Sequence, residues 1–210
     1  MLLLLLQLAR DTIGEYRRRH GDEELLRTIE IVHPPTGEVF VERLYKELSA
    51  VIGDIERSAD IRQKDGEERI TIDVISGLHR AGYNATHDAY SKGHADITVT
   101  QDNFVWLGEA KIHKDYEWVL KGLKQLLGRY TTGREYGSGL LIYIRGSNAS
   151  AVLDEWRRRL EKGNECDLKR TEDADKAEKL AFWSIHTHEG CGLAIRTKHL
   201  GVSLYFKPEA

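Results

Sequence analysis

The stretch HADITVTQDNFVWLGEAKI, residues 94–112, decides how this chain is interpreted. Its apolar residues predict two strands, and Asp102-Asn103 supplies the residues of a tight turn between them. Residues two apart on a strand point to the same face, so Glu109 and Lys111 project side by side, and Asp96 can face them from the neighbouring strand. Burying such charges in an apolar setting is costly unless they pair or bind a metal. The pattern therefore needs an explanation, which is either a metal site or a surface strand face that carries a salt bridge.

The elements expected around this hairpin alternate between helix and strand. Residues 67–82 have the pattern of a helix that ends at Gly82, and residues 83–90 that of a first strand. An amphipathic helix is expected over residues 114–130, and residues 137–146 form an apolar run typical of a central buried strand. The predicted fold class is α/β, in the order helix, three-strand meander, helix and strand, with a parallel, right-handed last crossover.

Three zones are expected within one domain. Residues 1–65 are predicted to form a helical N-terminal decoration packed on the core, residues 66–165 the core, and residues 166–210 a C-terminal appendage made of a strand pair. Within the first zone, HPPTGE at residues 33–38 is expected to be the turn of a short hairpin. A helix is expected to follow over residues 42–57.

Composition, net charge and cysteine content limit the class of protein that we expect. The chain has 210 residues, of which 40% are hydrophobic and 31% charged, as in a soluble globular protein able to bury a core. The formal net charge of −3 gives no global electrostatic case for nucleic-acid binding, which would need local basic patches. The cysteines, Cys166 and Cys191, form no zinc pattern and suggest no disulfide framework, so a reducing cytoplasm is the expected compartment.

The apolar start of the chain does not predict a membrane segment. The run MLLLLLQLAR, residues 1–10, is too short to span a bilayer and lacks the basic region and cleavage site of a signal peptide. Residues 2–19 are expected to form a helix that packs on the domain or on a second subunit. A homo-oligomer is therefore expected, with a dimer favoured and no membrane partner.

The order of elements carrying Asp and then Glu-x-Lys resembles the PD-(D/E)XK nuclease superfamily, which has the restriction-endonuclease-like fold. The matching residues are Asp96, within Gly-His-Ala-Asp-Ile at residues 93–97, and Glu109-Ala110-Lys111 after the apolar run. Gln125 and Tyr130 are similar to the Gln-x-x-x-Tyr element of some branches, at a spacing one residue longer. The resemblance covers residues 66–146 and not the flanking zones.

This resemblance implies a divalent-metal-dependent endonuclease that hydrolyses phosphodiester bonds in DNA. Asp96 and Glu109, with the carbonyl of Ala110, would hold Mg²⁺, for which Mn²⁺ is a possible substitute, because Mg²⁺ prefers hard oxygen ligands. Lys111 is expected to orient the attacking water or stabilise charge rather than act as a base, since nearby carboxylates raise the pKa of an amine. Gln125 would order the site or contact phosphate. Tyr130 has either that role or a place in the core.

A further acid is expected from the helix before the first strand, as in many members of the superfamily. Glu68 is the first choice as a metal ligand, because it lies one helical step from Ile72 and Ile75, and Glu67 is the alternative. Weaker candidates are Asp73, Glu47 and, behind the site, Asp88.

Nucleic-acid contacts are expected from local positive charge. The residues predicted to bind nucleic acid surround the site or lie on the following helix: Lys114, Lys121, Lys124 and Arg129. Arg157–Arg159 and Arg17–Arg19 form two further basic clusters, which on helices are commonly only solvated faces. Base-reading modules are not visible, so sequence specificity is expected to be weak or supplied by a partner.

Other interpretations stay open beside this one. A cytoplasmic nuclease of this size fits a prokaryotic defence effector activated by a partner or by oligomerisation. The chain is alternatively a catalytically silent nucleic-acid-binding or scaffolding subunit on the same fold, an RNA-cleaving nuclease, or a protein-interaction module that uses its N-terminal helix. His186 and His188, near Cys191 and His199, are expected to form a hydrated strand face, with a zinc site as the alternative.

Overall fold

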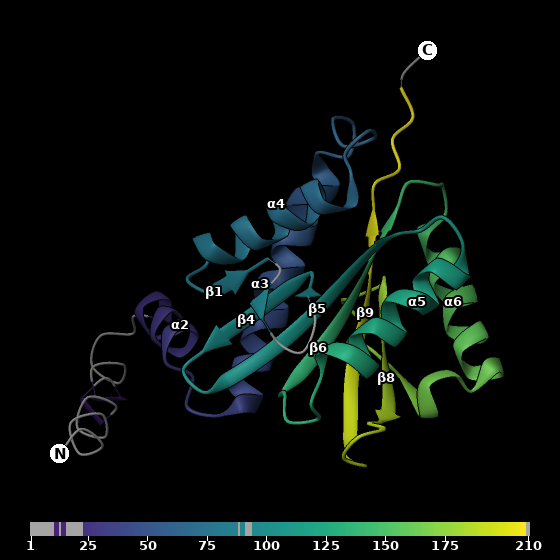
Figure 1. Ribbon diagram of the computed structural model, residues 1–210. Coiled ribbons are helices and arrows are strands. Elements are labelled where there is room, and N and C mark those ends of the chain that lie inside the picture. The colour runs from purple at the N-terminus through teal and green to yellow at the C-terminus, as the bar shows by residue number, and fades with distance from the viewer. Residues whose placement is uncertain (1–10, 13, 16–22, 88, 91–93, 209–210) are drawn as a thin grey trace.

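The computed structural model describes residues 11–12, 14–15, 23–87, 89–90 and 94–208 (Figure 1). Residues 11–12 and 14–15 are helical, whereas the rest of the helix expected over residues 2–19 lies outside the described part.

A seven-stranded mixed sheet forms the centre of the molecule. Its strands are, in spatial order, β1 (Asn84–Thr86), β4 (Ile97–Gln101), β5 (Phe104–Ile112), β6 (Gly137–Ile144), β9 (Ala194–Ser203), β8 (Ala181–Thr187) and β7 (Leu168–Asp173). β6 pairs in parallel with both β5 and β9, and all other neighbours pair antiparallel. The short strands β2 (Ala89–Tyr90) and β3 (His94–Ala95) form a separate antiparallel pair.

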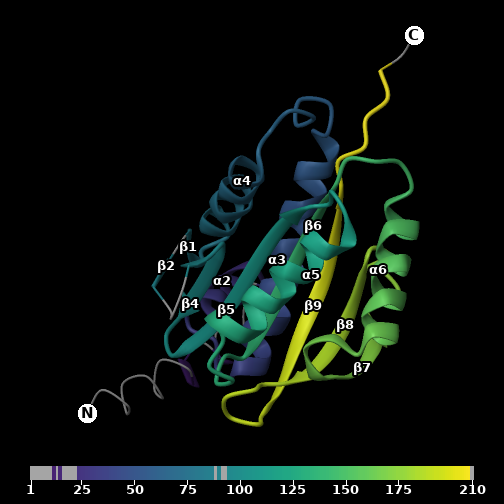
Figure 2. The same ribbon diagram turned by 45° about the vertical axis from the view of Figure 1, so that its right-hand side comes forward.

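Helices cover both faces of this sheet (Figures 1 and 2). On one face, α3 (Gly37–Arg57) and α4 (Glu67–Arg80) build a core with β1, β4, β5 and the inner residues of β6 and β9, and α2 (Glu23–Val32) packs beside α3. On the other face, α5 (Tyr116–Gln125) and α6 (Ala149–Gly163) pack on β6, β9 and β8. Because β6 is covered on both sides, every one of its residues is buried.

Helix starts follow the polar residues of the sequence. The side chains of Thr36, Asp115 and Asn148 accept hydrogen bonds from backbone N–H groups in the first turns of α3, α5 and α6. After α5 the chain continues as a π-helical turn over Leu126–Tyr130.

Several predicted elements are confirmed. The chain is α/β, α4 ends before Gly82, which has a positive φ, and β5 and β6 are parallel neighbours on either side of α5. The turn between β4 and β5 passes through Asp102, whose φ is also positive. The C-terminal strands form the expected antiparallel pair of β8 and β9.

The hairpin expected around residues 33–38 is wrong. Both flanking segments are helical, in α2 and α3, and Thr36 caps α3. Phe40, Leu44 and Leu48 recur every four residues and bury one face of α3 against the sheet, and this burial outweighs the local alternation of apolar and polar residues.

Strand pairing between distant parts of the chain also changes the arrangement predicted for the C-terminal zone. β7 lies within residues 163–179, whose polar composition predicts a loop or a loose helix start. β9 inserts beside β6, so the strand pair of residues 166–210 belongs to the central sheet. The first and second expected strands are each interrupted, and Asp96 occupies the bend between β3 and β4. No helix in the described part of the chain is long and apolar enough to cross a bilayer.

Candidate active site

The ammonium group of Lys111 lies at the centre of a cluster of three carboxylates. Its Nζ is 2.5 Å from Oε1 of Glu109, 3.6 Å from Oδ2 of Asp96 and 3.6 Å from Oε1 of Glu67. It also donates a hydrogen bond to the carbonyl of Ala110 at 3.1 Å. Glu109 and Lys111 share one face of β5, as the two-residue spacing predicts, while Asp96 and Glu67 arrive from other elements.

The end of strand pairing explains how two of these carboxylates are placed. β4 pairs with β5 only as far as Gly108, so the next N–H groups on that side of β5 need other acceptors. Oδ2 of Asp96 accepts from the N–H of Ala110 at 2.8 Å, and Oε2 of Glu67 accepts from the N–H of Ile112 at 2.7 Å. The two carboxylates therefore extend the edge of the sheet and are held beside Lys111.

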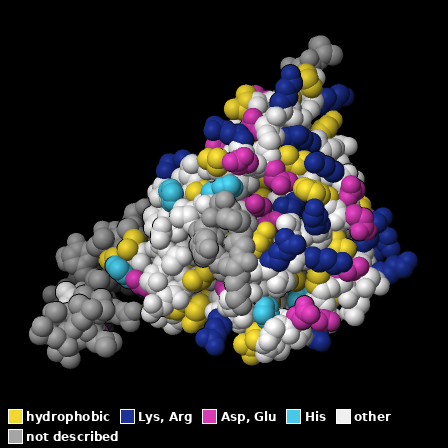
Figure 3. Space-filling view, viewed as in Figure 1, with side chains coloured by type: hydrophobic (Ala, Val, Ile, Leu, Met, Phe, Trp, Pro, Cys, Tyr) yellow, Lys and Arg dark blue, Asp and Glu magenta, His cyan; other side chains and the backbone are white. Residues whose placement is uncertain are grey.

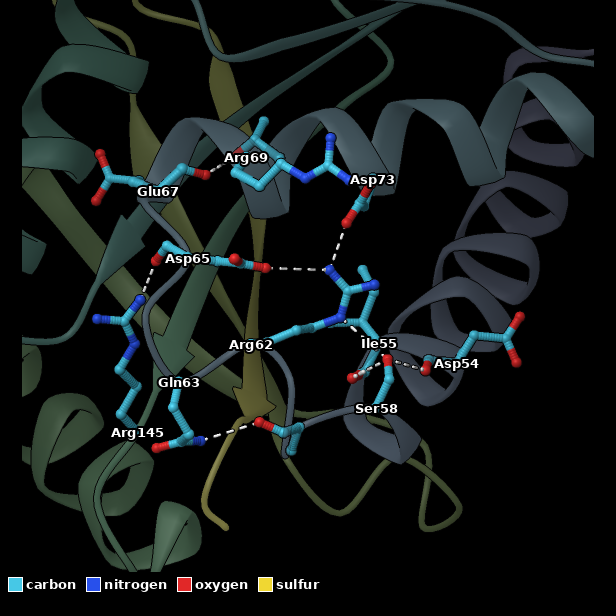
Figure 4. A network of polar contacts seen from close by, with 12 residues as sticks. Asp54, Ile55, Ser58, Arg62, Gln63, Asp65, Glu67, Arg69, Asp73 and Arg145 are labelled. Atoms are coloured by element: carbon cyan, nitrogen blue, oxygen red, sulfur yellow. Dashed lines mark hydrogen bonds and ion pairs between the residues drawn. The ribbon is translucent and has the colours of Figure 1, made fainter.

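A network of ionic contacts fixes the start of α4, from which Glu67 projects (Figure 4). Arg62, in the loop before α4, contacts the carboxylates of Asp73 and Asp65. Arg145, at the end of β6, donates to the backbone carbonyl of Asp65. Figure 4 shows Glu67 directed away from this network. The loop is thus tied to both α4 and the sheet, which limits the positions that Glu67 can take.

Burial perturbs the two charges on β5 in different ways. Glu109 is 1% exposed, and burial together with the charge of Asp96 raises its pKa to about 7, although Lys111 acts in the opposite direction. For Lys111, burial lowers the pKa, but the hydrogen bond and charge of Glu109 and the other carboxylates outweigh it and leave the pKa above its ordinary value. Lys111 therefore carries its proton at neutral pH and is unsuited to act as a base.

One oxygen of Glu109 is left without a hydrogen bond. Its Oε1 accepts from Lys111, while Oε2 is buried and has no partner among the residues that the structure describes. A buried carboxylate oxygen without a donor costs free energy, and native structures contain few of them. This atom is the part of the cluster that the protein itself does not satisfy.

The other wall of the site is α5 and the turn that follows it. A Cβ atom on Gly122 would lie 2.8 Å from Cγ of Lys111, so α5 packs directly against the site at this glycine. Burial and the charges of Glu109 and Asp96 raise the pKa of Tyr130, which lies on the π-helical turn. The phenol of Tyr130 therefore belongs to the surroundings of the carboxylates.

The helix acid at the site is Glu67, not Glu68. α4 begins at Glu67, whose side chain reaches back to β5, whereas Glu68 is one residue, or about 100°, further round the helix and is exposed. The weaker candidates do not take this place: Asp73 pairs with Arg62, Glu47 pairs with Arg27, and Asp88 lies outside the described residues.

Gln125 is not brought to the carboxylate cluster. It is half-buried and lines a groove on α5 together with Lys121, Lys124 and Arg129. Within the described part of the chain it has no hydrogen bond to Asp96, Glu109 or Lys111. Tyr130, for which the sequence leaves a core position equally open, is the member of this pair that lies near the site.

Basic side chains gather over α5 and α6 (Figure 3). Nζ of Lys114 and of Lys121 lie 4.9 and 5.0 Å from the centroid of the Trp118 ring, and Lys124 pairs with Glu165 at 2.9 Å. Arg129 is exposed. Arg157–Arg159, on α6, are each paired with an acidic neighbour. The third basic cluster, Arg17–Arg19, lies outside the described residues.

The expected hydrated face at His186 is wrong, because α6 and the turn Glu165–Asp167 before β7 cover it. His199 Nδ1 accepts from Nε1 of Trp156 at 3.0 Å, and the Ser184 hydroxyl lies 2.7 Å from Nε2 of both His199 and His186. His186 Nδ1 is 2.9 Å from the carbonyl oxygen of Cys166. The period-two spacing placed His186 on one face of β8 but carried no signal that this face would be covered.

Protein-family models, curated proteins and solved structures were all compared with the chain, and none matches it. No three His, Cys, Asp or Glu side chains within the described ranges lie close enough together to hold a metal ion. In the structure Lys111 lies between the carboxylates and contacts each of them. What the chain does is therefore inferred from the chemistry of this cluster.

Proposed function

We propose that the chain is a divalent-metal-dependent nuclease that hydrolyses phosphodiester bonds in DNA. The observation that carries the proposal is the buried, unpartnered Oε2 of Glu109 beside a protonated Lys111. A buried anionic oxygen with no donor is suited to a cation, and carboxylates with a backbone carbonyl are the ligands that Mg²⁺ prefers. The residues that would hold the ion are Asp96, Glu109 and Glu67, with the carbonyl of Ala110.

The order of elements supports the same proposal. Apart from the two-residue strands β2 and β3, which lie between β1 and β4, the elements α4, β1, β4, β5, α5 and β6 follow one another as helix, three strands, helix and strand. This is the order expected of a restriction-endonuclease-like core. The carboxylates and Lys111 lie where β5 leaves its pairing with β4, which opens the sheet edge to a ligand.

The chain's own residues have distinct tasks in the proposed reaction. A bound divalent ion lowers the pKa of a coordinated water and stabilises charge on a phosphate oxygen. Asp96 and Glu67 are held by backbone N–H groups, and the ammonium of Lys111 lies between them and Glu109, so the carboxylates would have to close on the ion as Lys111 moves aside. Lys111 keeps its proton and supplies a fixed positive charge that orients the attacking water or stabilises the transition state. α5 packs on the site at Gly122 and limits the access of water.

Cleavage of mixed DNA and RNA substrates in MgCl₂ or MnCl₂ tests the proposal. Lys111→Ala and Glu109→Gln are expected to lower the rate of DNA cleavage by about 100-fold or more, because each removes a charge that acts in the transition state. Glu67→Gln is expected to lower it as well, whereas Glu68→Gln, the matched exposed neighbour, should cleave like the wild type. Equal cleavage by Lys111→Ala, Glu109→Gln and the wild type would overturn the assignment, and cleavage of RNA alone would change the substrate.

A second candidate is a catalytically silent nucleic-acid-binding subunit on the same fold. The observation that favours it is that Lys111 already contacts all three carboxylates, as in a purely structural ion-pair cluster. DNA binding without turnover in Mg²⁺, Mn²⁺ or any other divalent ion would select this candidate.

A further inference from the structure

Most basic residues near the proposed site are already neutralised by acidic neighbours. Those with a carboxylate within ion-pair distance are Arg157 with Glu161 and Asp173, Arg158 and Arg159 with Glu155, and Lys124 with Glu165. A paired cation has little charge left for a ligand. The positive charge available to an incoming anion must come from other residues.

Lys114 and Lys121 are different. Both are exposed, and among the described residues neither has a carboxylate within ion-pair distance. Their ammonium groups nevertheless lie close to one ring, at 4.9 and 5.0 Å from the centroid of Trp118. The negative face of an indole ring attracts ammonium groups, which explains why two like charges gather here. An anion between them would offset their mutual repulsion.

The backbone holds Trp118 in a defined position. Asp115 caps α5 by accepting from the N–H of Trp118 at 2.7 Å, and Lys121 follows Trp118 by three residues, which places the two on one side of the helix. The indole Nε1 is buried and has no hydrogen-bond acceptor within the part of the chain that the structure describes. The ring is therefore an ordered support for the two lysines, and part of its own hydrogen-bonding capacity is unused.

The same ring reaches the proposed catalytic cluster. Nζ of Lys111 lies 5.7 Å from the Trp118 centroid. All three distances are measured to the same centroid, so no two of these ammonium groups lie further apart than the sum of their distances to it. That separation corresponds to at most about three nucleotides of a strand that rises ~3.4 Å per nucleotide. Lys111 is held between its carboxylates, whereas Lys114 and Lys121 have none within ion-pair distance among the described residues, so the outer two are the ones available to bind a neighbouring phosphate.

We propose that Lys114 and Lys121, ordered by the ring of Trp118, bind a backbone phosphate of the nucleic acid next to the scissile one. The position of the scissile phosphate rests on the proposed function, whereas the phosphate contact itself does not. The ligand is the phosphodiester and not a base, because the site offers two ammonium groups and a ring that they already cover. It should therefore carry no sequence preference.

Binding of a labelled DNA oligonucleotide in EDTA, at several salt concentrations, tests this site without any cleavage. The double variant Lys114→Gln/Lys121→Gln is expected to bind about ten-fold more weakly and to lower the slope of log K against log salt by about 1, since one phosphate contact contributes about 0.9 to it. The matched control, Lys169→Gln/Lys176→Gln, removes the same charge on and after β7 at the opposite edge of the sheet and should keep the wild-type slope.

Two further arms separate a specific site from its alternatives. Trp118→Leu keeps both lysines and is expected to weaken binding several-fold while leaving the salt slope nearly unchanged. Inorganic phosphate, titrated in parallel, is expected to compete only weakly, because it lacks the neighbouring phosphates of a strand. Thermal melting of each variant checks that the chain still folds.

The outcomes distinguish this proposal from the nuclease assignment. A slope that falls equally in both double variants would overturn it, because the charge would then act diffusely. Absence of DNA binding by the wild type, or lysine-dependent binding of inorganic phosphate but not of DNA, would overturn it too. A normal lysine effect in a chain that never cleaves would keep the phosphate site and remove the nuclease assignment.

Discussion

Two buried lysine–glutamate pairs in this molecule have similar partners and different surroundings. On β9, Lys198 is 3% exposed and donates to both carboxylate oxygens of Glu178, at 2.6 Å each. On β5, Lys111 donates to only one oxygen of Glu109, and the other oxygen has no partner in the described structure. The first pair is complete by itself. The second leaves one carboxylate oxygen unsatisfied among the described residues, and this difference separates a structural ion pair from a candidate site.

The surroundings of the two pairs also differ in how completely polar groups are satisfied. The ring of Tyr45 lies 4.5 Å from the ammonium of Lys198, and the hydroxyl of Ser49 donates to Glu178, so the β9 pair is packed and satisfied on several sides. Near β5, the N–H groups of the sheet edge are capped by the carboxylates of Asp96 and Glu67. Polar groups buried for stability are paired with one another, whereas those at the site point toward a common space.

The largest effect on the free energy of unfolding is expected when the glutamate of one pair is replaced. Glu178→Gln leaves Lys198 as a buried charge without a counter-ion and is expected to lower the free energy of unfolding by about 3–5 kcal/mol in urea. Glu109→Gln should cost about 1 kcal/mol or less, because Lys111 keeps Asp96 and Glu67 at 3.6 Å and the strained carboxylate is removed. Equal losses of unfolding free energy in the two variants would show that the pairs are equivalent and would contradict the distinction between them.

A change of pH is expected to change the stability of the region around β8 and β9, where two buried histidines are hydrogen-bonded. Burial lowers the pKa of His199 well below its ordinary value, and burial also lowers that of His186. Below about pH 6.5 these two side chains therefore bind protons in the unfolded chain and not in the folded one, so their contribution to stability is complete above this pH and falls as the pH drops through it. Glu109, whose pKa is raised to about 7, contributes in the opposite direction.

Urea unfolding at about pH 7.5 and about pH 5 measures this loss, which is expected to be at most about 2 kcal/mol for each of the two histidines. His186→Gln should lose part of the acid sensitivity. The exposed His87→Gln should keep all of it, and a His186→Gln variant with the acid sensitivity of the wild type would contradict the buried hydrogen-bond chain.

The smallest expected effect concerns the wall of the site. Gly53→Ala, on α3, should stabilise the chain by about 0.5–1 kcal/mol, since alanine favours a helix and only the flexible end of Arg57 lies near the new Cβ. Gly122→Ala should lose that gain, because its Cβ would meet Cγ of Lys111 at 2.8 Å. DNA cleavage by Gly122→Ala is expected to fall about ten-fold, as Lys111 shifts. Equal stabilisation and normal cleavage in both variants would show that α5 does not restrain Lys111.

Local pattern predicted the centre of the site. The two-residue period of β5 placed Glu109 and Lys111 on one face, and the turn at Asp102 brought Asp96 near them. The choice of Glu68 rested on its spacing from Ile72 and Ile75, but Ile72 is exposed in the structure, so this spacing did not mark the buried face of α4. A shift of one residue turns a helical side chain by about 100°.

Periodicity and turn chemistry determined by themselves that this chain is α/β, that β4 and β5 form a hairpin, and that two charges share a face of β5. Only the tertiary structure decided which charges are satisfied. It placed β9 beside β6, covered His186 and His199, selected Glu67, and gathered Lys114 and Lys121 around Trp118. The physical reason is that strand period and helix capping are local, whereas burial and hydrogen-bond satisfaction depend on partners far away in the chain.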